Sequence, residues 1–352
     1  SLSVFDLHFK MEESQFSFQP GLSTESAIFC FKQIVQYYTT RKTPVFACFF
    51  DLSKLRAETT LSGEIISIFK YWYAQQSNCV RWSGKYSDPY RLDCGVRQGG
   101  LSSPRLLNLY INQLMVEPSS ASIGCHVDGA CVNNLSYADD LVLLRPSIGA
   151  MRQLLAVCES YAVAHGLRYN THKREIIMFK SKGIKYGYTP TVSLYGEPLR
   201  WVKKCKYLGH WVTEDMCDND NIERERRSLT GRCNMLARKF ARCTKSVIIT
   251  LFKAYCQSFY TCSLWVSYTL RAFSDLRVQY NNAFRVLLGL PWRCSASLMF
   301  VEGQADTFAA IMRKRCSSMM PRVRNSTSSI LRVFADRWDS SLQQRRVKIH
   351  VI

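Results

Sequence analysis

The sequence predicts an α+β fold, with strands and helices interspersed up to about residue 215 and mainly helices after it. Strand-like apolar segments at 45–52, 141–144 and 175–180 lie between longer segments whose apolar residues repeat at helical spacing. From about residue 218 onward the pattern is helical and rich in arginine and lysine. A chain of 352 residues is long enough for two or three subdomains.

The first expected helix covers residues 25–39, and Ser23 or Thr24 can cap its N-terminus. A strand at 45–52 follows it, and a second helix is expected at about 62–75. A hairpin is expected at 78–82 with 90–94, a loop that opens a helix at 95–115, and a second hairpin around 137–140. A helix at 149–165, a strand at 175–180 and a small sheet of 192–194 with 207–212 follow.

Two acidic segments interrupt the apolar strands. Asp51 lies at the end of the first strand, and Asp139 and Asp140 lie between the apolar stretches 134–136 and 141–144. Carboxylates in such places are costly unless a cation holds them, and three of them on neighbouring strands suit a magnesium-dependent nucleotidyl transfer site. A solvated hairpin turn is the alternative for the adjacent pair, because Asp is a common turn residue.

The charge balance favours a polyanionic partner. The chain has 47 lysines and arginines against 27 aspartates and glutamates, a net charge of +20. Such an excess promotes phosphate contacts and the release of condensed counterions from nucleic acid. A membrane surface is the competing partner, but no basic amphipathic anchor stands out and no apolar run is long enough to span a bilayer.

The cysteines indicate an intracellular protein, and we expect it in the cytoplasm and nucleus. None of the 15 cysteines forms a Cys-x-x-Cys pair or a Cys/His cluster with zinc spacing. Their odd number and the lack of a signal peptide favour reduced, mostly buried thiols. The chain starts at Ser1 without a methionine, so we expect it to be a fragment.

Six segments, in this order, resemble the motifs of one enzyme family. They are Phe49–Lys54, Gly95–Gly99, Ser103-Pro104 with Asn108–Ile111, Tyr137–Asp140, Gly166-Leu167 with Asn170 and Lys173, and Tyr207–Gly209. This set resembles the reverse transcriptases of non-LTR (LINE-type) retrotransposons over residues 15–315. A single motif is weak evidence, but six in sequence order are not expected by accident.

The resemblance implies a right-hand polymerase fold with fingers, a palm and a helical thumb. In such a fold the palm is an antiparallel sheet backed by helices. The implied divisions are partial fingers at 1–44, the palm with remaining fingers and the primer-grip region at 45–215, the thumb at 216–275, and a helical C-terminal extension at 276–352.

The resemblance also implies two Mg²⁺ ions, with Mn²⁺ as an alternative, bound by the acidic segments. The residues that match the metal ligands are Asp51 and Asp139, and Asp140 assists them or orients the pair. One ion lowers the pKa of the primer 3′-hydroxyl, and both stabilise charge as pyrophosphate leaves. Crowded carboxylates repel each other, so we expect a loose site without metal.

Five other residues match positions that contact the nucleotide, the template or the leaving group in this family. By resemblance, Arg97, Gln98, Gly99 and Tyr137 bind nucleotide and template, and Lys173 protonates or neutralises pyrophosphate. Glycine in that loop permits close approach of the backbone to a base or sugar. The alternatives are a plain helix-entry turn for the loop and a solvated surface charge for the lysine.

The primer grip is expected at Tyr207, Leu208 and Gly209, with simple packing of the tyrosine as the alternative. The basic run 224–245 is expected to be a thumb helix that follows a duplex backbone, independently of base sequence. A solvated helix face is the alternative for this run. The residues expected to contact the nucleic-acid backbone are Arg224, Arg227, Arg238, Lys239 and Arg242.

Three departures from the family pattern bear on activity. After Lys54 a family segment is missing, and Arg56 stands where a bulky residue normally lies under the ribose. Around Phe18, the family's glycine and arginines are replaced by Ser17, Gln19 and Leu22, so we expect weaker binding of triphosphate. We also expect no endonuclease domain, because none precedes the first residue.

Two functions therefore stay open. The first is an RNA-directed DNA polymerase domain of a retroelement, impaired by the missing segment, that uses an RNA template, a DNA primer and deoxynucleoside triphosphates. The second is a retroelement remnant that folds and binds nucleic acid without catalysis. Primer extension on an RNA template distinguishes them, since only the first predicts incorporation that depends on Asp139.

Overall fold

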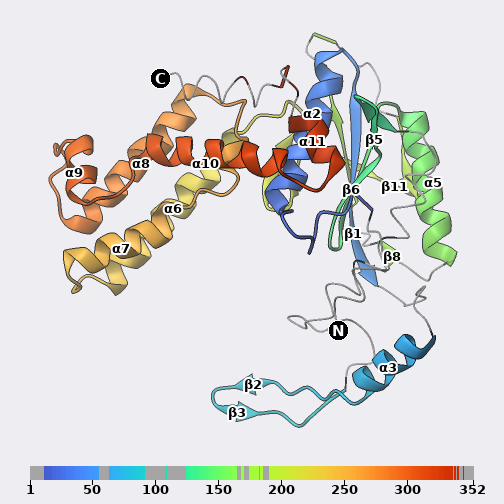
Figure 1. Ribbon diagram of the computed structural model, residues 1–352, viewed down its shortest axis with the longest axis horizontal. Coiled ribbons are helices and arrows are strands. Elements are labelled where there is room, and N and C mark those ends of the chain that lie inside the picture. The colour runs from blue at the N-terminus through green and yellow to red at the C-terminus, as the bar shows by residue number, and fades with distance from the viewer. Residues whose placement is uncertain are drawn as a thin grey trace.

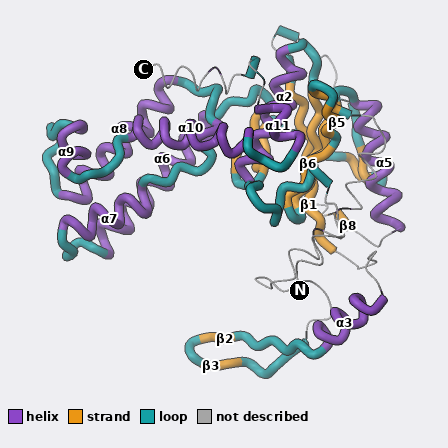
Figure 2. The backbone as a smooth tube through the Cα atoms, viewed as in Figure 1, coloured by secondary structure: helices purple, strands orange, loops and turns teal. Residues whose placement is uncertain are grey.

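A six-stranded sheet lies at the centre of the computed structural model (Figures 1 and 2). Its order is β12-β9-β1-β7-β6, and β8 also pairs with β1. The neighbours are antiparallel, except that β12 runs parallel to β9. The strands are β1 (Val45–Lys54), β6 (Asn134–Tyr137), β7 (Asp140–Arg145), β8 (Arg168–Tyr169), β9 (Glu175–Phe179) and β12 (Arg200–Trp201). The residues that the structure describes are 12–54, 63–91, 108, 112, 124–164, 168–169, 174–181, 183–184, 190–335, 337, 339–340 and 344.

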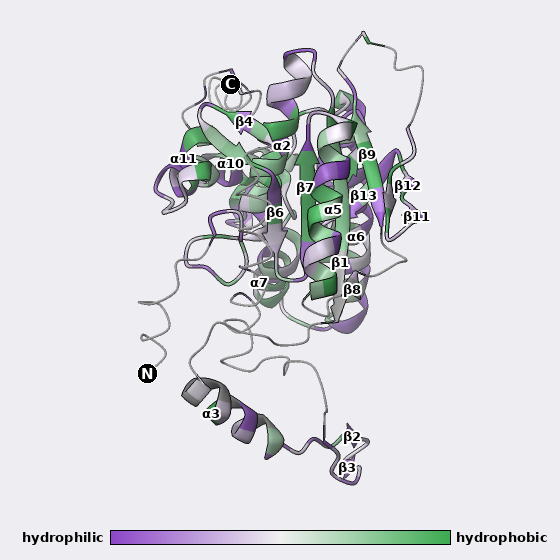
Figure 3. Ribbon diagram, turned by 90° about the vertical axis from the view of Figure 1, so that its right-hand side faces the viewer, coloured by the Kyte–Doolittle hydropathy of each residue, from purple (hydrophilic) through white to green (hydrophobic). Residues whose placement is uncertain are grey.

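Both faces of the sheet are covered, because its strands are apolar on both sides. In β1, Val45, Ala47 and Phe49 join the cluster on the side of helix α2 (Thr24–Thr40). Phe46, Cys48 and Phe50 join the cluster on the side of α5 (Ile148–Ala164). Successive strand residues point to opposite faces, so this apolar run requires a helix on each side (Figure 3).

The predicted helices begin and end close to their expected positions. Helix α2 starts after Ser23, whose hydroxyl oxygen accepts a hydrogen bond from the Ser26 backbone N–H at 3.3 Å. This is the capping that the sequence predicts. The second helix is α3 (Gly63–Ala74), and the helix predicted at 149–165 is α5.

Among the described residues, four two-stranded hairpins lie outside the sheet, and the first of them stands apart from it (Figure 1). They are β2 (Arg81–Trp82) with β3 (Lys85–Tyr86), β4 (Cys125–Val127) with β5 (Ala130–Val132), β10 (Ser193–Leu194) with β11 (Glu197–Pro198), and β13 (Lys204–Tyr207) with β14 (His210–Thr213). The prediction that 192–194 and 207–212 form one sheet is wrong. Each instead pairs within its own hairpin, because a tight turn with two positive φ angles follows at Tyr195-Gly196 and at Leu208-Gly209.

The second half of the chain is a helical bundle around its own apolar cluster. Phe252, Trp265, Tyr280 and Phe284 are fully buried there. No helix among the described residues is long and apolar enough to cross a membrane. The elements are α6 (Asn219–Lys239), α7 (Lys245–Cys256), the 3₁₀ turn η2 (Cys262–Leu264), α8 (Leu270–Leu288), α9 (Ala296–Glu302), α10 (Phe308–Arg324) and α11 (Ser329–Ala335).

Helix α10 connects the bundle to the sheet. Its first part, with Phe308 and Ile311, packs in the bundle cluster. Its last part, with Met319 and Val323, packs with α2 and α11 in the cluster on one face of the sheet (Figure 1). The predicted division into a thumb at 216–275 and a C-terminal extension stays a prediction; its boundary falls inside α8.

Candidate active site

The acidic pair lies at the tip of the β6–β7 hairpin. Tyr137 and Asp140 are the closing pair, and Ala138 and Asp139 form the two-residue turn. Ala138 has a φ of 54°, a left-handed conformation that costs roughly 1–2 kcal/mol for a residue other than glycine. Strain of this kind is concentrated at functional sites. The turn leaves Asp139 exposed and Asp140 half-buried.

The first acidic strand lies directly beside this hairpin. β1 pairs antiparallel with β7, and the register sets Asp51 opposite Asp140. Residues directly opposite each other in such a pair have Cβ atoms about 4.5–5.5 Å apart. Position 51 is therefore a direct cross-strand neighbour of the second residue of the acidic pair, and one residue away from the turn that holds the first.

The types of residue in this arrangement fit a magnesium ion. Carboxylate oxygens are hard ligands of the kind that Mg²⁺ takes in nucleotide-processing sites. The structure describes the backbone of Asp51 and not its side chain. Among the side chains that are described, no group of three or more His, Cys, Asp and Glu residues is placed to hold a metal. The roles of Asp51, Asp139 and Asp140 as ligands thus stay predictions.

The predicted primer-grip residues form the tip of the β13–β14 hairpin, next to the acidic pair. Tyr207 is buried, and Leu208 and Gly209 have φ angles of 46° and 77°. Burial raises the pKa of the Tyr207 phenol well above its usual value, and the charge of Asp140 raises it further. Among the residues that the structure describes, the Tyr207 hydroxyl has no hydrogen-bond partner.

Tyr260 and Arg224 hold the tip of that hairpin from the helical side. The Tyr260 hydroxyl donates to the Leu208 carbonyl at 2.6 Å, and its hydrogen-bond contact with the hydroxyl of Thr24 is 3.2 Å long. The Arg224 guanidinium donates to the Gly209 carbonyl and lies 5.4 Å from the centre of the Tyr260 ring. A Cβ at Gly209 would lie 3.3 Å from that ring, so the close approach itself favours glycine.

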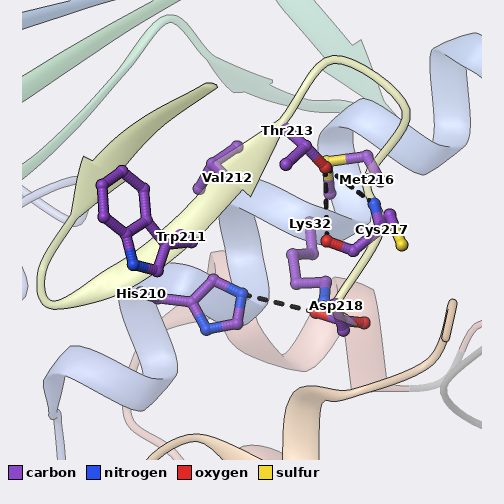
Figure 4. A pocket seen from close by; sticks show the side chains of 8 residues that line it. All are labelled: Lys32, His210, Trp211, Val212, Thr213, Met216, Cys217 and Asp218. Atoms are coloured by element: carbon purple, nitrogen blue, oxygen red, sulfur yellow. Dashed lines mark hydrogen bonds and ion pairs between the residues drawn. The ribbon is translucent and has the colours of Figure 1, made fainter. Parts of the chain in front are cut away.

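A buried polar network lies where α2, the β13–β14 hairpin and the start of α6 meet (Figure 4). The Lys32 ammonium donates to Asp218 Oδ1 at 2.7 Å and to the Leu264 carbonyl at 2.8 Å. The other Asp218 oxygen accepts the backbone N–H groups of Val266 at 2.7 Å and Ser267 at 3.2 Å. This network ties the sheet side to the helical bundle through one saturated carboxylate.

Hydrogen-bonding groups contact both ring nitrogens of His210. Its Nδ1 lies 2.8 Å from the Thr261 hydroxyl oxygen, and that hydroxyl donates to the Tyr260 carbonyl at 2.7 Å. Its Nε2 lies 3.2 Å from the Asn221 amide nitrogen and 3.5 Å from Asp218 Oδ1 (Figure 4). The imidazole is therefore held on both sides by the polar groups of this network.

Burial sets the protonation states in this network. It lowers the pKa of His210 from 6.5 to about 4, although the nearby Asp218 opposes the shift. Burial also acts to raise the pKa of Asp218, but the charge of Lys32 and the hydrogen bonds with His210 and Lys32 outweigh it and bring the pKa to about 2. We call this network of Lys32, Asp218 and His210 the junction. Near neutral pH it contains one ammonium, one carboxylate and one neutral imidazole.

The basic residues of α6 fall into two groups. Near its start, Arg224 is committed to Gly209 and to Glu225. Arg226 and Arg227 both pair with Glu223, although 77% of the Arg227 side chain is exposed. Near its end, the basic residues are exposed to solvent, and none of them pairs with an acidic residue in the described part of the chain. These are Arg238, Lys239 and the following Arg242.

Four predicted site residues lie outside the described residues. They are Arg97, Gln98, Gly99 and Lys173. Sequence reasoning also missed four residues that shape the site: Lys32, Asp218, His210 and Tyr260. One signal was available for Lys32, a single cation inside the apolar stretch 27–35 of an amphipathic helix.

Known proteins resemble this chain in sequence. Residues 3–212 match the family model described as reverse transcriptase (RNA-dependent DNA polymerase). A 115 kDa protein of the type-1 retrotransposable element R1DM from Drosophila melanogaster is 28% identical over 152 residues, which is 41% of this chain and 13% of that protein. The chain thus spans about one eighth of the length of this relative.

One solved structure aligns with almost the whole chain. Apo telomerase from Candida tropicalis aligns with a TM-score of 0.42 at 10% identity, over 99% of this chain and 56% of that one.

Proposed function

Because this chain belongs to the reverse transcriptase (RNA-dependent DNA polymerase) family, we propose that it is a retroelement polymerase domain that copies RNA into DNA by two-metal nucleotidyl transfer. The observation that carries the proposal is the register that sets Asp51 opposite Asp140, beside the strained turn at Ala138 and Asp139. All of these residues lie within the part of the chain that matches the family model.

In this proposal Asp51 and Asp139 hold two Mg²⁺ ions, for which Mn²⁺ can substitute, and Asp140 orients the pair. When bound, the ions activate the primer 3′-hydroxyl and neutralise the leaving pyrophosphate. The half-buried Tyr137 supports the turn and faces the nucleotide. Arg97, Gln98 and Gly99 would contact nucleotide and template, and Lys173 would supply a proton to pyrophosphate.

The primer is positioned by the hairpin tip at Tyr207, Leu208 and Gly209. Tyr260 and Arg224 support this assignment, because they fix both carbonyls of the tip next to the acidic pair. Arg224 therefore acts by holding the grip, and direct contact with the nucleic-acid backbone is proposed for the exposed Arg238, Lys239 and Arg242 and for Arg227, which reaches it by leaving Glu223.

A second candidate is a remnant that binds nucleic acid without polymerising. The shortened segment after Lys54 favours it, because Arg56 replaces the residue that supports the ribose in the family pattern. Residues 55–62 lie outside the described residues, so this departure is argued from sequence.

Primer extension with an RNA template, a DNA primer and Mg²⁺ tests the proposal. Asp139→Asn removes a metal-binding charge and is expected to lower the extension rate at least about a hundredfold, since metal stabilisation is worth several kcal/mol. Asp275→Asn, a matched change at another exposed aspartate on α8, is expected to have no effect. A wild-type protein that binds RNA but adds no nucleotide would support the second candidate.

A further inference from the structure

Helix α3 and the hairpin that follows it stand apart from the sheet and the bundle (Figures 1 and 3). We call residues 78–90 the aromatic hairpin. Trp82 is 80% exposed and Tyr86 is 64% exposed, and Tyr90 is also exposed. Rings of this size are normally buried, as Trp265 is in the bundle. A group of exposed rings on one small element marks a binding surface.

The backbone of the aromatic hairpin holds its shape without help from these rings. Asn78 and Tyr90 exchange two backbone hydrogen bonds of 2.8 Å, and the Ser87 N–H donates to the Val80 carbonyl at 2.9 Å. The turn at Ser83 and Gly84 has φ angles of 47° and 79°, as a type I′ hairpin turn requires. The rings of Trp82 and Tyr86 take no part in these backbone contacts and are largely exposed to solvent.

Each cross-strand pair of the aromatic hairpin joins one ring to one cation. The register sets Arg81 opposite Tyr86 and Trp82 opposite Lys85. The Arg81 guanidinium carbon lies 5.6 Å from the centre of the Tyr86 ring. Neighbouring residues on a strand point to opposite faces, so each face of the hairpin presents one ring and one cation.

We propose that the aromatic hairpin binds single-stranded RNA, with Trp82 and Tyr86 stacking on unpaired bases while Lys85 and Arg81 contact phosphates. Rings interleaved with cations are the means by which proteins bind unpaired strands without reading their sequence. The charge is complementary, because residues 78–91 carry three cations and a single carboxylate, Asp88. A protein partner is a poorer match, since the centres of protein interfaces are depleted in lysine.

This binding surface is separate from the proposed polymerase site and does not depend on catalysis. The first test measures binding of a fluorescent oligouridine to the full chain by anisotropy. Trp82→Ala is expected to weaken the Kd about 5- to 150-fold, the range for loss of one stacked base. Trp82→Phe is expected to keep most of the affinity. Lys85→Ala is expected to reduce the slope of log K against log salt by about 0.7.

Trp292→Ala is the matched control. Trp292 is 78% exposed, and the Arg293 guanidinium lies 4.7 Å from the centre of its ring, but both residues lie in the turn between α8 and α9. It is expected to leave oligouridine binding unchanged. Equal losses in both alanine variants, or no loss in Trp82→Ala, would overturn the proposal. So would a wild-type dimer that Trp82→Ala converts to a monomer, because the surface would then bind a second copy.

Failure of the polymerase proposal would look different. A silent wild type in primer extension leaves the oligouridine result intact, and Asp139→Asn is expected to bind oligouridine as the wild type does. Far-ultraviolet circular dichroism of each variant verifies that the chain is folded.

Discussion

Asp218 and Asp139 are both carboxylates beside the central sheet, but the protein surrounds them in different ways. Asp218 is buried, and Lys32 and two backbone N–H groups donate to its oxygens. Asp139 lies exposed at the tip of a strained turn, next to the half-buried Asp140. The first carboxylate is buried and saturated by the protein itself, and the second is exposed at the surface.

The difference separates a charge that stabilises the fold from a charge that we expect to act in the reaction. A buried carboxylate that accepts several hydrogen bonds has no remaining position for a ligand. Its hydrogen bonds therefore contribute to the free energy of folding. Exposed carboxylates crowded on one hairpin repel each other and are stabilised when a cation binds. Removing the charge should therefore change stability at Asp218 and activity at Asp139.

The largest expected effect on stability is at the junction. Asp218→Asn leaves the Lys32 ammonium buried without a countercharge, and we expect a loss of about 3–5 kcal/mol in the free energy of unfolding. Urea denaturation followed by circular dichroism measures it. Asp139→Asn should stay within about 0.5 kcal/mol of the wild type in the same assay, as surface changes do.

Asp220→Asn is the control for this comparison. Asp220 pairs with Lys204 at 3.2 Å, and both side chains are about half exposed. Such a surface pair is worth about 0–1 kcal/mol. If Asp218→Asn were no more destabilising than Asp220→Asn, the distinction between the two carboxylate sites would be lost.

A second, smaller effect is expected on acidification. His210 has a pKa of about 4 in the folded protein and an ordinary value of 6.5. The unfolded chain therefore takes up a proton first, and stability falls as the pH drops from 6.5 towards 4. Between about pH 7 and about pH 5 the loss is about 2 kcal/mol. Asp218, with a pKa lowered from 3.8 to about 2, adds a further loss only below pH 4.

Replacing the histidine tests this assignment. His210→Gln keeps one donor and one acceptor but cannot titrate, so its unfolding free energy is expected to change less between the same two pH values. An unchanged slope in His210→Gln would place the acid sensitivity elsewhere in the protein.

The smallest effect is expected at Tyr260, which holds the tip of the β13–β14 hairpin from the helical side. Tyr260→Phe removes the hydrogen bond to Leu208, which is worth about 1 kcal/mol. We expect the KM for primer–template to rise about fivefold while kcat stays nearly constant, because the grip binds the primer without taking part in the chemistry. Tyr255→Phe, at an exposed tyrosine on α7, is the control. A fall in kcat alone would contradict this role.

Much of the fold follows from local pattern. The apolar spacing after Ser23 predicted α2, and the apolar run that ends in Asp51 predicted the central strand. Both signals are contained within one element. The backbone also brings the two acidic segments into register, as the prediction of a shared site requires.

The junction could not be predicted, because its partners are far apart in sequence. Lys32 and Asp218 are 186 residues apart, and Tyr260 meets Leu208 from 52 residues away. A lone lysine or tyrosine carries no local sign of such a partner. Arg224 was predicted to contact nucleic acid for the same reason, since sequence alone does not show that the Gly209 carbonyl is within reach.

Helix α10 joins the two hydrophobic cores of the protein. Since its two ends are embedded in separate cores, the angle between the sheet and the bundle is set before any substrate arrives. If the bundle rotated away from the sheet, the apolar residues at one end of α10 would lose their packing contacts. Exposing those apolar residues to water is unfavourable, so the packing of α10 opposes a change in the angle between the sheet and the bundle.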